Sequence, residues 1–224
     1  MGKDELSRSP VAGLVVLALL LVAAFVGAFA FRETTPPSCR DRRETLSADV
    51  DGDGRRDIVW RAVDGDDLAV GVCTASGVET QTAASGGGEG TFYGMDVEPD
   101  GRAEVVQGGT TALAALEEVI VFDGSRLVTV SSTGGSLVLE TGDAAGDGSF
   151  SDWGCDDVAG DGRREIVHST LAWRGAEASL RRVAYAIDAA QAQVVSDTTR
   201  SHPVPADREN PWADRLTTPC GPPP

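Results

Sequence analysis

The sequence has few of the residues from which zinc sites and nucleic-acid surfaces are built. It contains two histidines, and its four cysteines form no C-x-x-C pair, so the usual zinc-ligand spacings are missing. Lys and Arg total 19 against 35 Asp and Glu, which gives a net charge of −16. Because phosphate contacts need a cationic surface, we expect no nucleic acid among the partners.

The sequence also lacks the short motifs of common enzyme classes. No G-x-S-x-G, H-E-x-x-H or Walker-type phosphate loop occurs. An adjacent acidic pair such as Asp66-Asp67 would point to opposite faces of a strand, which does not suit the paired carboxylates of a glycosidase. We interpret His168 as structural, and Trp60 and Trp153, which lie beside acidic loops, as core residues. We therefore expect that the chain is not an enzyme.

One long apolar run lies near the amino terminus. Val11 to Phe31 contains no charged or amide side chain, and as a helix rising about 1.5 Å per residue it is long enough to cross a bilayer. The length of the run favours an uncleaved signal anchor, and the alternative is a signal peptide cleaved near Ala30, where Ala28-Phe29-Ala30 has a small-x-small pattern. We expect residues 1–10 to form a short cytoplasmic tail, residues 11–31 a transmembrane signal anchor and residues 32–44 a linker.

All four cysteines follow this run: Cys39, Cys73, Cys155 and Cys220. An even number of widely spaced cysteines on an exported domain predicts two disulfides. Of the three pairings that four cysteines permit, we slightly favour Cys39–Cys73 with Cys155–Cys220. The chain would then be a single-pass protein of the cell membrane with its bulk outside the cytoplasm, or a secreted protein if the segment is cleaved. The alternative is a cytoplasmic domain with reduced thiols, the orientation that a count of flanking positive charges weakly favours.

An acidic loop occurs three times in the rest of the chain. The first copy runs from Asp49 to Asp57, with carboxylates at positions 1, 3, 5 and 9 and Gly at position 6, and the others cover residues 96–104 and 157–165. Ca²⁺ takes six to eight oxygen ligands, and carboxylates at this spacing converge if the chain curls. In the first loop the candidate ligands are Asp49, Asp51, Asp53, the carbonyl of Arg55, and Asp57.

The acidic loops have two alternatives to a calcium site. An EF-hand is excluded, because position 12 is Trp60 and the residues after the loop are typical of a strand rather than a helix. At each loop the other alternative is a solvated turn without an ion. That alternative is stronger for the second and third loops, which have longer Glu side chains or, with Ala159, no ligand at position 3.

Each loop is followed by the same series of strand-like runs. After a short apolar run come Leu68 to Cys73, Glu118 to Phe122 and Arg182 to Ile187 in the three copies, and each is followed by a turn and a further extended run. β-Branched and apolar residues between Asp/Gly turns are typical of antiparallel strands. We expect three small antiparallel sheets that cover one another's apolar faces. From Thr198 the Pro-rich tail is expected to be irregular.

The run Asp-x-Asp-Gly-Asp-Gly-Arg-x-Asp of the first loop resembles the FG-GAP/VCBS repeat of integrin-like β-propellers. Phe92-Tyr93-Gly94 and Trp153-Gly154 are similar to the aromatic-Gly prelude of that repeat, whereas its Gly-Ala-Pro portion is missing. The resemblance implies that each unit is a four-stranded blade whose loop between the first two strands binds calcium. It also implies the counterpart ligands Asp96, Glu98, Asp100 and Glu104 in the second loop, and Asp157, Asp161 and Glu165 in the third.

Full propellers of this family have more than three blades. We therefore expect an all-β domain of three propeller-blade-like antiparallel units over residues 45–197, or four if the ends contribute, forming an incomplete or small β-propeller. One N-terminal transmembrane helix precedes it and a Pro-rich tail, residues 198–224, follows it. Self-association would be one way to complete the packing.

The expected function is that of a membrane-anchored, extracytoplasmic, calcium-binding module that binds an unidentified cell-surface protein or glycan without catalysis. Two alternatives stay open. One is a secreted or tethered hydrolase that uses calcium for stability. The other is an acidic stalk domain with a purely structural role.

Overall fold

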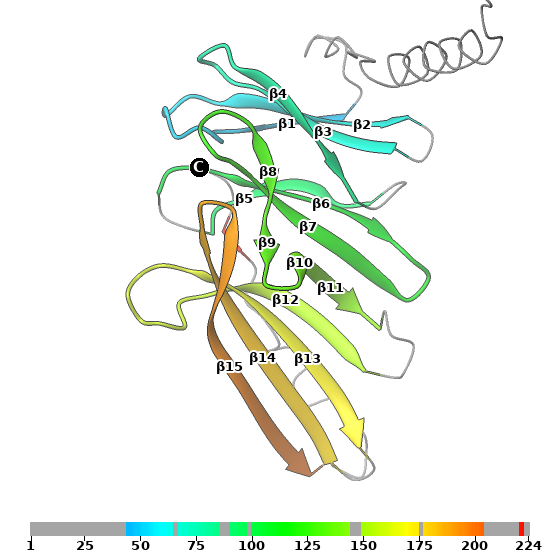
Figure 1. Ribbon diagram of the computed structural model, residues 1–224. Coiled ribbons are helices and arrows are strands. Elements are labelled where there is room, and N and C mark those ends of the chain that lie inside the picture. The colour runs from blue at the N-terminus through cyan, green and yellow to red at the C-terminus, as the bar shows by residue number, and fades with distance from the viewer. Residues whose placement is uncertain are drawn as a thin grey trace, which may run out of the picture. The chain divides into compact units, whose positions relative to one another are not determined.

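The structure is a computed structural model (Figure 1) that describes residues 44–64, 67–85, 90–97, 100–143, 149–174, 177–203 and 220–221. These residues belong to one unit of the chain, Ser38–Pro224. The expected membrane segment 11–31, Cys39, Glu98 and residues 204–219 lie outside them. Within the described residues there is no helix with the length and hydrophobicity needed to cross a membrane.

The first loop, the strand before it and the runs that follow it form a four-stranded antiparallel sheet, here called the first unit. Its strands follow one another in space as they do in the sequence, and each pairs antiparallel with the next. The strands are β1 (Glu44–Ala48), β2 (Asp57–Asp64), β3 (Asp67–Cys73) and β4 (Glu79–Ala84).

The second and third loops belong to two further four-stranded units of the same order. The second unit contains β5 (Phe92–Met95), β6 (Glu104–Thr110), β7 (Ala114–Phe122) and β8 (Leu127–Thr129). The third unit contains β12 (Phe150–Asp156), β13 (Glu165–Arg174), β14 (Glu177–Asp188) and β15 (Gln191–Pro203). In both units consecutive strands pair antiparallel. The three antiparallel units are therefore present as predicted, but they form two sheets rather than three.

The second and third units are joined into one open sheet. In the sequence, three short strands lie between these units: β9 (Ser131–Ser132), β10 (Gly135–Ser136) and β11 (Val138–Gly142). Strand β11 pairs with both β7 and β12, which gives the order β10-β9-β15-β14-β13-β12-β11-β7-β6-β5, and β8 pairs with β7. The only parallel pair among the described strands is β9 with β15, at Ser131 and Gln191. Neither sheet closes on itself within the described residues.

Two segments rich in Gly, Ser or Thr form regular structure, and for one of them this was not expected. β9 and β10 form a hairpin at residues 131–136, and Leu137 beside it is buried. The tail was expected to be irregular from Thr198, but β15 continues to Pro203 because β14 offers paired backbone groups along its full length. Thr and Ser side chains in this part of β15 suit an exposed strand.

The core consists of two layers, one on each face of the second unit. Val105 and Ile120 lie opposite each other on β6 and β7 and pack with Val59 and Val72 of the first unit. Their neighbours along the strands point the other way, so Val106 and Val119 pack with Leu139, Ile166 and Ile187 toward the third unit. Burial of each such side chain contributes about 1.5 to 3 kcal/mol. As expected, each unit covers the apolar face of its neighbour.

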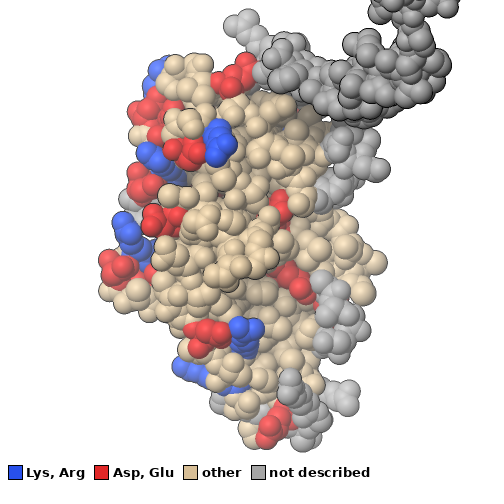
Figure 2. All heavy atoms as spheres, viewed as in Figure 1, with Lys and Arg blue, Asp and Glu red and all other residues tan. Residues whose placement is uncertain are grey.

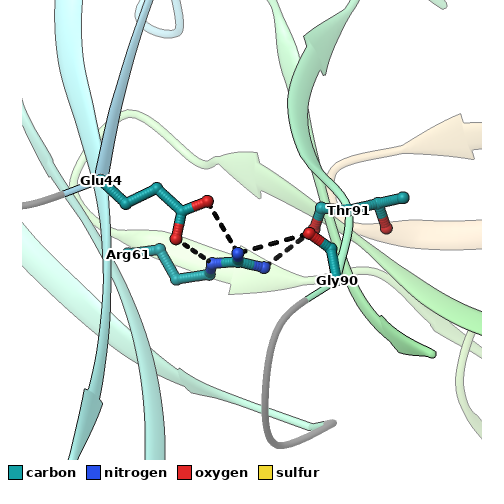
Figure 3. A network of polar contacts seen from close by, with 4 residues as sticks. All are labelled: Glu44, Arg61, Gly90 and Thr91. Atoms are coloured by element: carbon teal, nitrogen blue, oxygen red, sulfur yellow. Dashed lines mark hydrogen bonds and ion pairs between the residues drawn. The ribbon is translucent and has the colours of Figure 1, made fainter. Parts of the chain in front are cut away.

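A buried arginine adds a polar link between the first two units (Figure 3). The Arg61 side chain is 4% exposed, and its Nε and Nη2 atoms donate to the two Glu44 carboxylate oxygens at 2.8 and 2.7 Å. Its Nη1 and Nη2 also donate to the carbonyls of Thr91 and Gly90 at 3.0 and 3.4 Å. A guanidinium with this many partners orients the start of β5 against the first unit.

Candidate metal centre

The three acidic loops occupy equivalent places in the three units. Each connects the first and second strands, and the carboxylate at position 9 begins the second strand. Asp57 pairs with Ala48, Glu104 with Met95 and Glu165 with Asp156. The repeat seen in the sequence is therefore also a structural repeat, with the loop where it was expected.

The first loop curls around the carboxylate of Asp49. Its Oδ1 and Oδ2 atoms accept hydrogen bonds from the backbone N–H groups of Gly52 and Gly54, both at 2.8 Å. The two glycines have φ of 77° and 81°, a left-handed conformation that costs little only without a Cβ. Asp49 thus provides the acceptor, and the Asp-Gly-Asp-Gly sequence that follows provides the two turns that bring the N–H groups to it.

Asp57 and Asp51 connect the loop to the turn between β3 and β4. Asp57 is 1% exposed, and its two oxygens accept from the backbone N–H groups of Val50 at 2.9 Å and Ala75 at 2.7 Å. Asp51 Oδ2 accepts from the Ser76 hydroxyl at 3.0 Å. The loop is therefore held at both ends by contacts that require no ion.

The geometry of the first loop fits a calcium ion. Asp49, Asp51 and Asp57 each offer one carboxylate oxygen, and these oxygens lie within 4.8 Å of one another. Ligands at about 2.3 to 2.6 Å from one Ca²⁺ can be at most about 5 Å apart, so the three oxygens could share an ion. A carboxylate oxygen that accepts one N–H still has a lone pair for a metal. Asp53 is outside this group; it is exposed, and its Oδ1 accepts from the N–H of Arg55 at 2.8 Å.

The second and third loops keep the same hydrogen bonds around positions 5 and 9. Glu104 and Glu165 accept from the N–H of position 2 at 2.9 and 2.7 Å, as Asp57 does. Asp100 and Asp161 accept from the N–H of position 7 at 2.8 and 2.9 Å, as Asp53 does. These carboxylates therefore shape the loop whether or not an ion is present.

The third loop keeps its shape without gathering its ligands. Asp157 accepts from Gly160 and Gly162, in the manner of the first loop. In the described part of the chain, however, the first loop alone brings together three carboxylates at ion-sharing distance, so Asp157, Asp161 and Glu165 do not form such a group. In the second loop, Glu98 lies outside the described residues. The calcium prediction for these two loops rests on sequence alone.

Arginines from the neighbouring loop offset part of this negative charge. The N–H of Ala103 donates to the Asp49 carbonyl at 2.7 Å, and the Arg102 side chain lies against Gly52. Burial raises the pKa of Asp96, and the nearby Arg164 counteracts this rise. Acidic and basic side chains lie next to each other along the margin of the molecule that carries the loops (Figures 1 and 2).

The second loop also contains a carboxyl group that is largely neutral at pH 7. Burial raises the pKa of Glu104 to about 8, and the charges of Asp100 and Asp96 add to the rise, while the N–H of Val97 opposes it. Without an ion, a protonated Glu104 reduces the repulsion among the carboxylates of this loop.

The disulfide expectation is confirmed for one pair. Cys155 and Cys220 form a disulfide. Cys73 is also disulfide-bonded, but its expected partner Cys39 lies outside the described residues. A disulfide suits an exported domain.

The structure also tests the aromatic and histidine assignments. Trp60 is 1% exposed and belongs to the core, as expected. His168 is half-buried in β13, and burial lowers the pKa of its imidazole. Trp153 is half-buried: it packs against the core, as expected, and it also lines a cleft together with Tyr93 and Glu117. The sequence placed Tyr93 and Trp153 in equivalent preludes but gave no sign that Glu117 lies beside them.

No family model, curated protein or solved structure matches the chain. The likeness to FG-GAP/VCBS repeats therefore stays a prediction, which rests on the first loop and on the position of each loop in its unit.

Proposed function

We propose that this chain is a membrane-anchored, extracytoplasmic module of FG-GAP/VCBS-like repeats that binds calcium and recognises a cell-surface protein or glycan without catalysis. The observation that carries the calcium part is the group formed by Asp49, Asp51 and Asp57, whose oxygens lie within 4.8 Å of one another. In this proposal the Arg55 carbonyl and water complete the coordination. The repeated unit with its loop between the first two strands supports the assignment to a propeller-like, incomplete fold.

The ion would act on stability. Three carboxylates at this distance repel one another, and a divalent cation that binds the folded loop and not the unfolded chain stabilises the fold by mass action. The gain is about 2.7 kcal/mol at 100 times the dissociation constant. Because Asp57 and Asp51 also contact the β3–β4 turn, this stabilisation would extend from the loop to the first unit.

The location outside the cytoplasm is supported by the Cys155–Cys220 disulfide and by the apolar segment 11–31. Thiol counting on protein from its native membrane tests it. We expect no free thiols in the unfolded, unreduced chain. Four free thiols would contradict the location.

The calcium proposal is tested by thermal unfolding of the full chain in detergent, stripped with EGTA and then given about 5 mM Ca²⁺ or Mg²⁺. We expect Ca²⁺ to raise the melting temperature and Mg²⁺ to do so poorly, since Mg²⁺ retains its waters and demands a tighter octahedron. Asp51→Asn should abolish the rise, and Asp161→Asn, the same change in the third loop, should retain it. An unchanged melting temperature in the wild-type protein would contradict the proposal.

The absence of catalysis is tested separately. We expect no turnover of peptide, ester, phosphate or glycoside substrates, with or without calcium. Calcium-dependent turnover would instead support the tethered hydrolase.

A further inference from the structure

A cleft of about 660 Å³ opens between strands of the second and third units. Its walls come from β5, β7, β11 and β12 and from the short segment Cys220–Gly221. Pockets for small ligands have volumes of about 300 to 1,000 Å³, so the cleft has the size of a binding site. The residues that line it with polar or aromatic groups are Tyr93, Glu117, Thr141, Asp152 and Trp153.

The cleft is held open by contacts from the far end of the chain. Strand β5 is the edge of the large sheet, and three strands separate it from β12. The Gly221 carbonyl accepts the N–H of Asp96, just after β5, at 3.2 Å, while Cys220 is disulfide-bonded to Cys155 on β12. These two links hold the ends of β5 and β12 on either side of the same short segment. One wall of the cleft is therefore tied to this segment by a disulfide and the other by a hydrogen bond, which favours a cleft that is formed before a ligand arrives.

Two aromatic rings face this space, and one is locked in place. Trp153 Nε1 donates to Glu117 Oε2 at 2.5 Å, and Glu117 is only 5% exposed. A buried carboxylate that holds the indole N–H fixes the plane of the ring. Tyr93 is 38% exposed. Burial raises the pKa of its hydroxyl, and the nearby carboxylate of Glu117 adds to the rise. The phenol thus stays protonated and can donate a hydrogen bond.

This combination is suited to a sugar. A pyranose ring has an apolar C–H face that packs on an aromatic ring, and hydroxyl groups around its edge that donate to carboxylates and exchange hydrogen bonds with hydroxyl groups. The cleft offers Tyr93 and Trp153 for the face, and Glu117, Asp152 and Thr141 for the edge. No Lys or Arg occurs among the lining residues of the described chain, so an anionic sugar would be repelled.

We propose that this cleft binds a neutral, hexose-based oligosaccharide. The inference deepens the proposed function, since it identifies the partner of the module as a glycan. A quaternary ammonium ion is the other ligand that rings and carboxylates attract. Such a compact cation needs a tight cage of rings, whereas this cleft is large, open and has two rings.

The test is calorimetric titration of the full chain, in a detergent without a sugar headgroup, with neutral trisaccharides of glucose, galactose, mannose and N-acetylglucosamine. We expect at least one of them to bind. Tyr93→Ala removes a partly exposed ring from the wall of the cleft and should weaken that binding about tenfold, with the melting curve of the variant as the check on its fold. Glu117→Gln should also weaken it, because an uncharged amide is a poorer hydrogen-bond acceptor. Trp173→Ala is the matched control, since Trp173 is 42% exposed and does not line the cleft.

Each outcome decides the proposal. Binding that is lost in Tyr93→Ala and kept in Trp173→Ala supports it. No binding of any trisaccharide, or equal binding by the wild type and Tyr93→Ala, overturns it, as does binding of choline in place of the sugars. Melting curves with Ca²⁺ and EGTA on the same samples separate this result from the calcium proposal. A chain that responds to calcium but binds no sugar overturns the glycan site alone.

Discussion

Asp57→Ala should destabilise the protein even when no calcium is present. Asp57 is 1% exposed, and its two oxygens are the acceptors for the N–H groups of Val50 and Ala75. Leaving a buried N–H without an acceptor costs about 1 to 3 kcal/mol, and Val50 is buried whereas Ala75 is half-buried. We expect a loss of about 2 to 4 kcal/mol, a large part of the roughly 5 to 15 kcal/mol that stabilises a typical domain.

The assay is urea unfolding of the full chain in detergent with EGTA, followed by tryptophan fluorescence. Asp57→Asn keeps one acceptor oxygen and should lose about half as much stability as Asp57→Ala. Asp53→Ala is the control, because Asp53 is exposed and accepts a single N–H, from Arg55. Equal losses for Asp57→Ala and Asp53→Ala in EGTA would refute the structural role assigned to the buried carboxylate.

Three further changes have defined outcomes. Burial raises the Glu104 pKa from its ordinary 4.5 to about 8, so between these pH values the folded state holds a proton that the unfolded chain releases. The free energy of unfolding of the wild-type protein should therefore fall by up to about 1.4 kcal/mol per pH unit between about pH 4.5 and 8. Glu104→Gln should remove this slope in urea unfolding at pH 5, 6, 7 and 8, and an identical slope would refute the assignment. Cys220→Ser removes the disulfide to Cys155, which closes a loop of 65 residues, and should cost about 4 kcal/mol of stability in the chain-entropy model. The melting temperature under non-reducing conditions should fall, and an unchanged value would show that the disulfide is dispensable. Ala189→Gly should raise the melting temperature, since Ala189 and Ala190 have φ of 44° and 70° in the β14–β15 turn, and a lower melting temperature would contradict left-handed strain there.

The sequence predicted the parts of the fold that depend on local pattern. Asp-Gly loops fix the position of a tight turn, and β-branched runs on both sides of them define strands. This is why the runs expected at Leu68 to Cys73 and Glu118 to Phe122 lie within β3 and β7. The curled shape of the first loop could also be expected from the sequence, because glycines such as Gly52 and Gly54 are the residues that a left-handed turn requires.

The parts that were missed depend on partners distant in the sequence. Strand β11 exists because β7 and β12 offer it two edges, and the sequence around Val138 does not identify those partners. Trp153 packs against the core, as predicted, but the sequence did not indicate that its N–H donates to Glu117, which is 36 residues away. Asp53 lies outside the group formed by Asp49, Asp51 and Asp57, and its role as a ligand stays a prediction.

The central claim is that the first loop binds calcium through Asp49, Asp51 and Asp57. Isothermal titration calorimetry of Ca²⁺ into the EGTA-stripped full chain, wild type and variants side by side, tests it most directly. We expect binding with a dissociation constant of about 0.1 to 1 mM, lost in Asp51→Asn and unchanged in Asp161→Asn. An absence of binding heat in the wild-type protein, or binding that survives Asp51→Asn and disappears in Asp161→Asn, would contradict the claim.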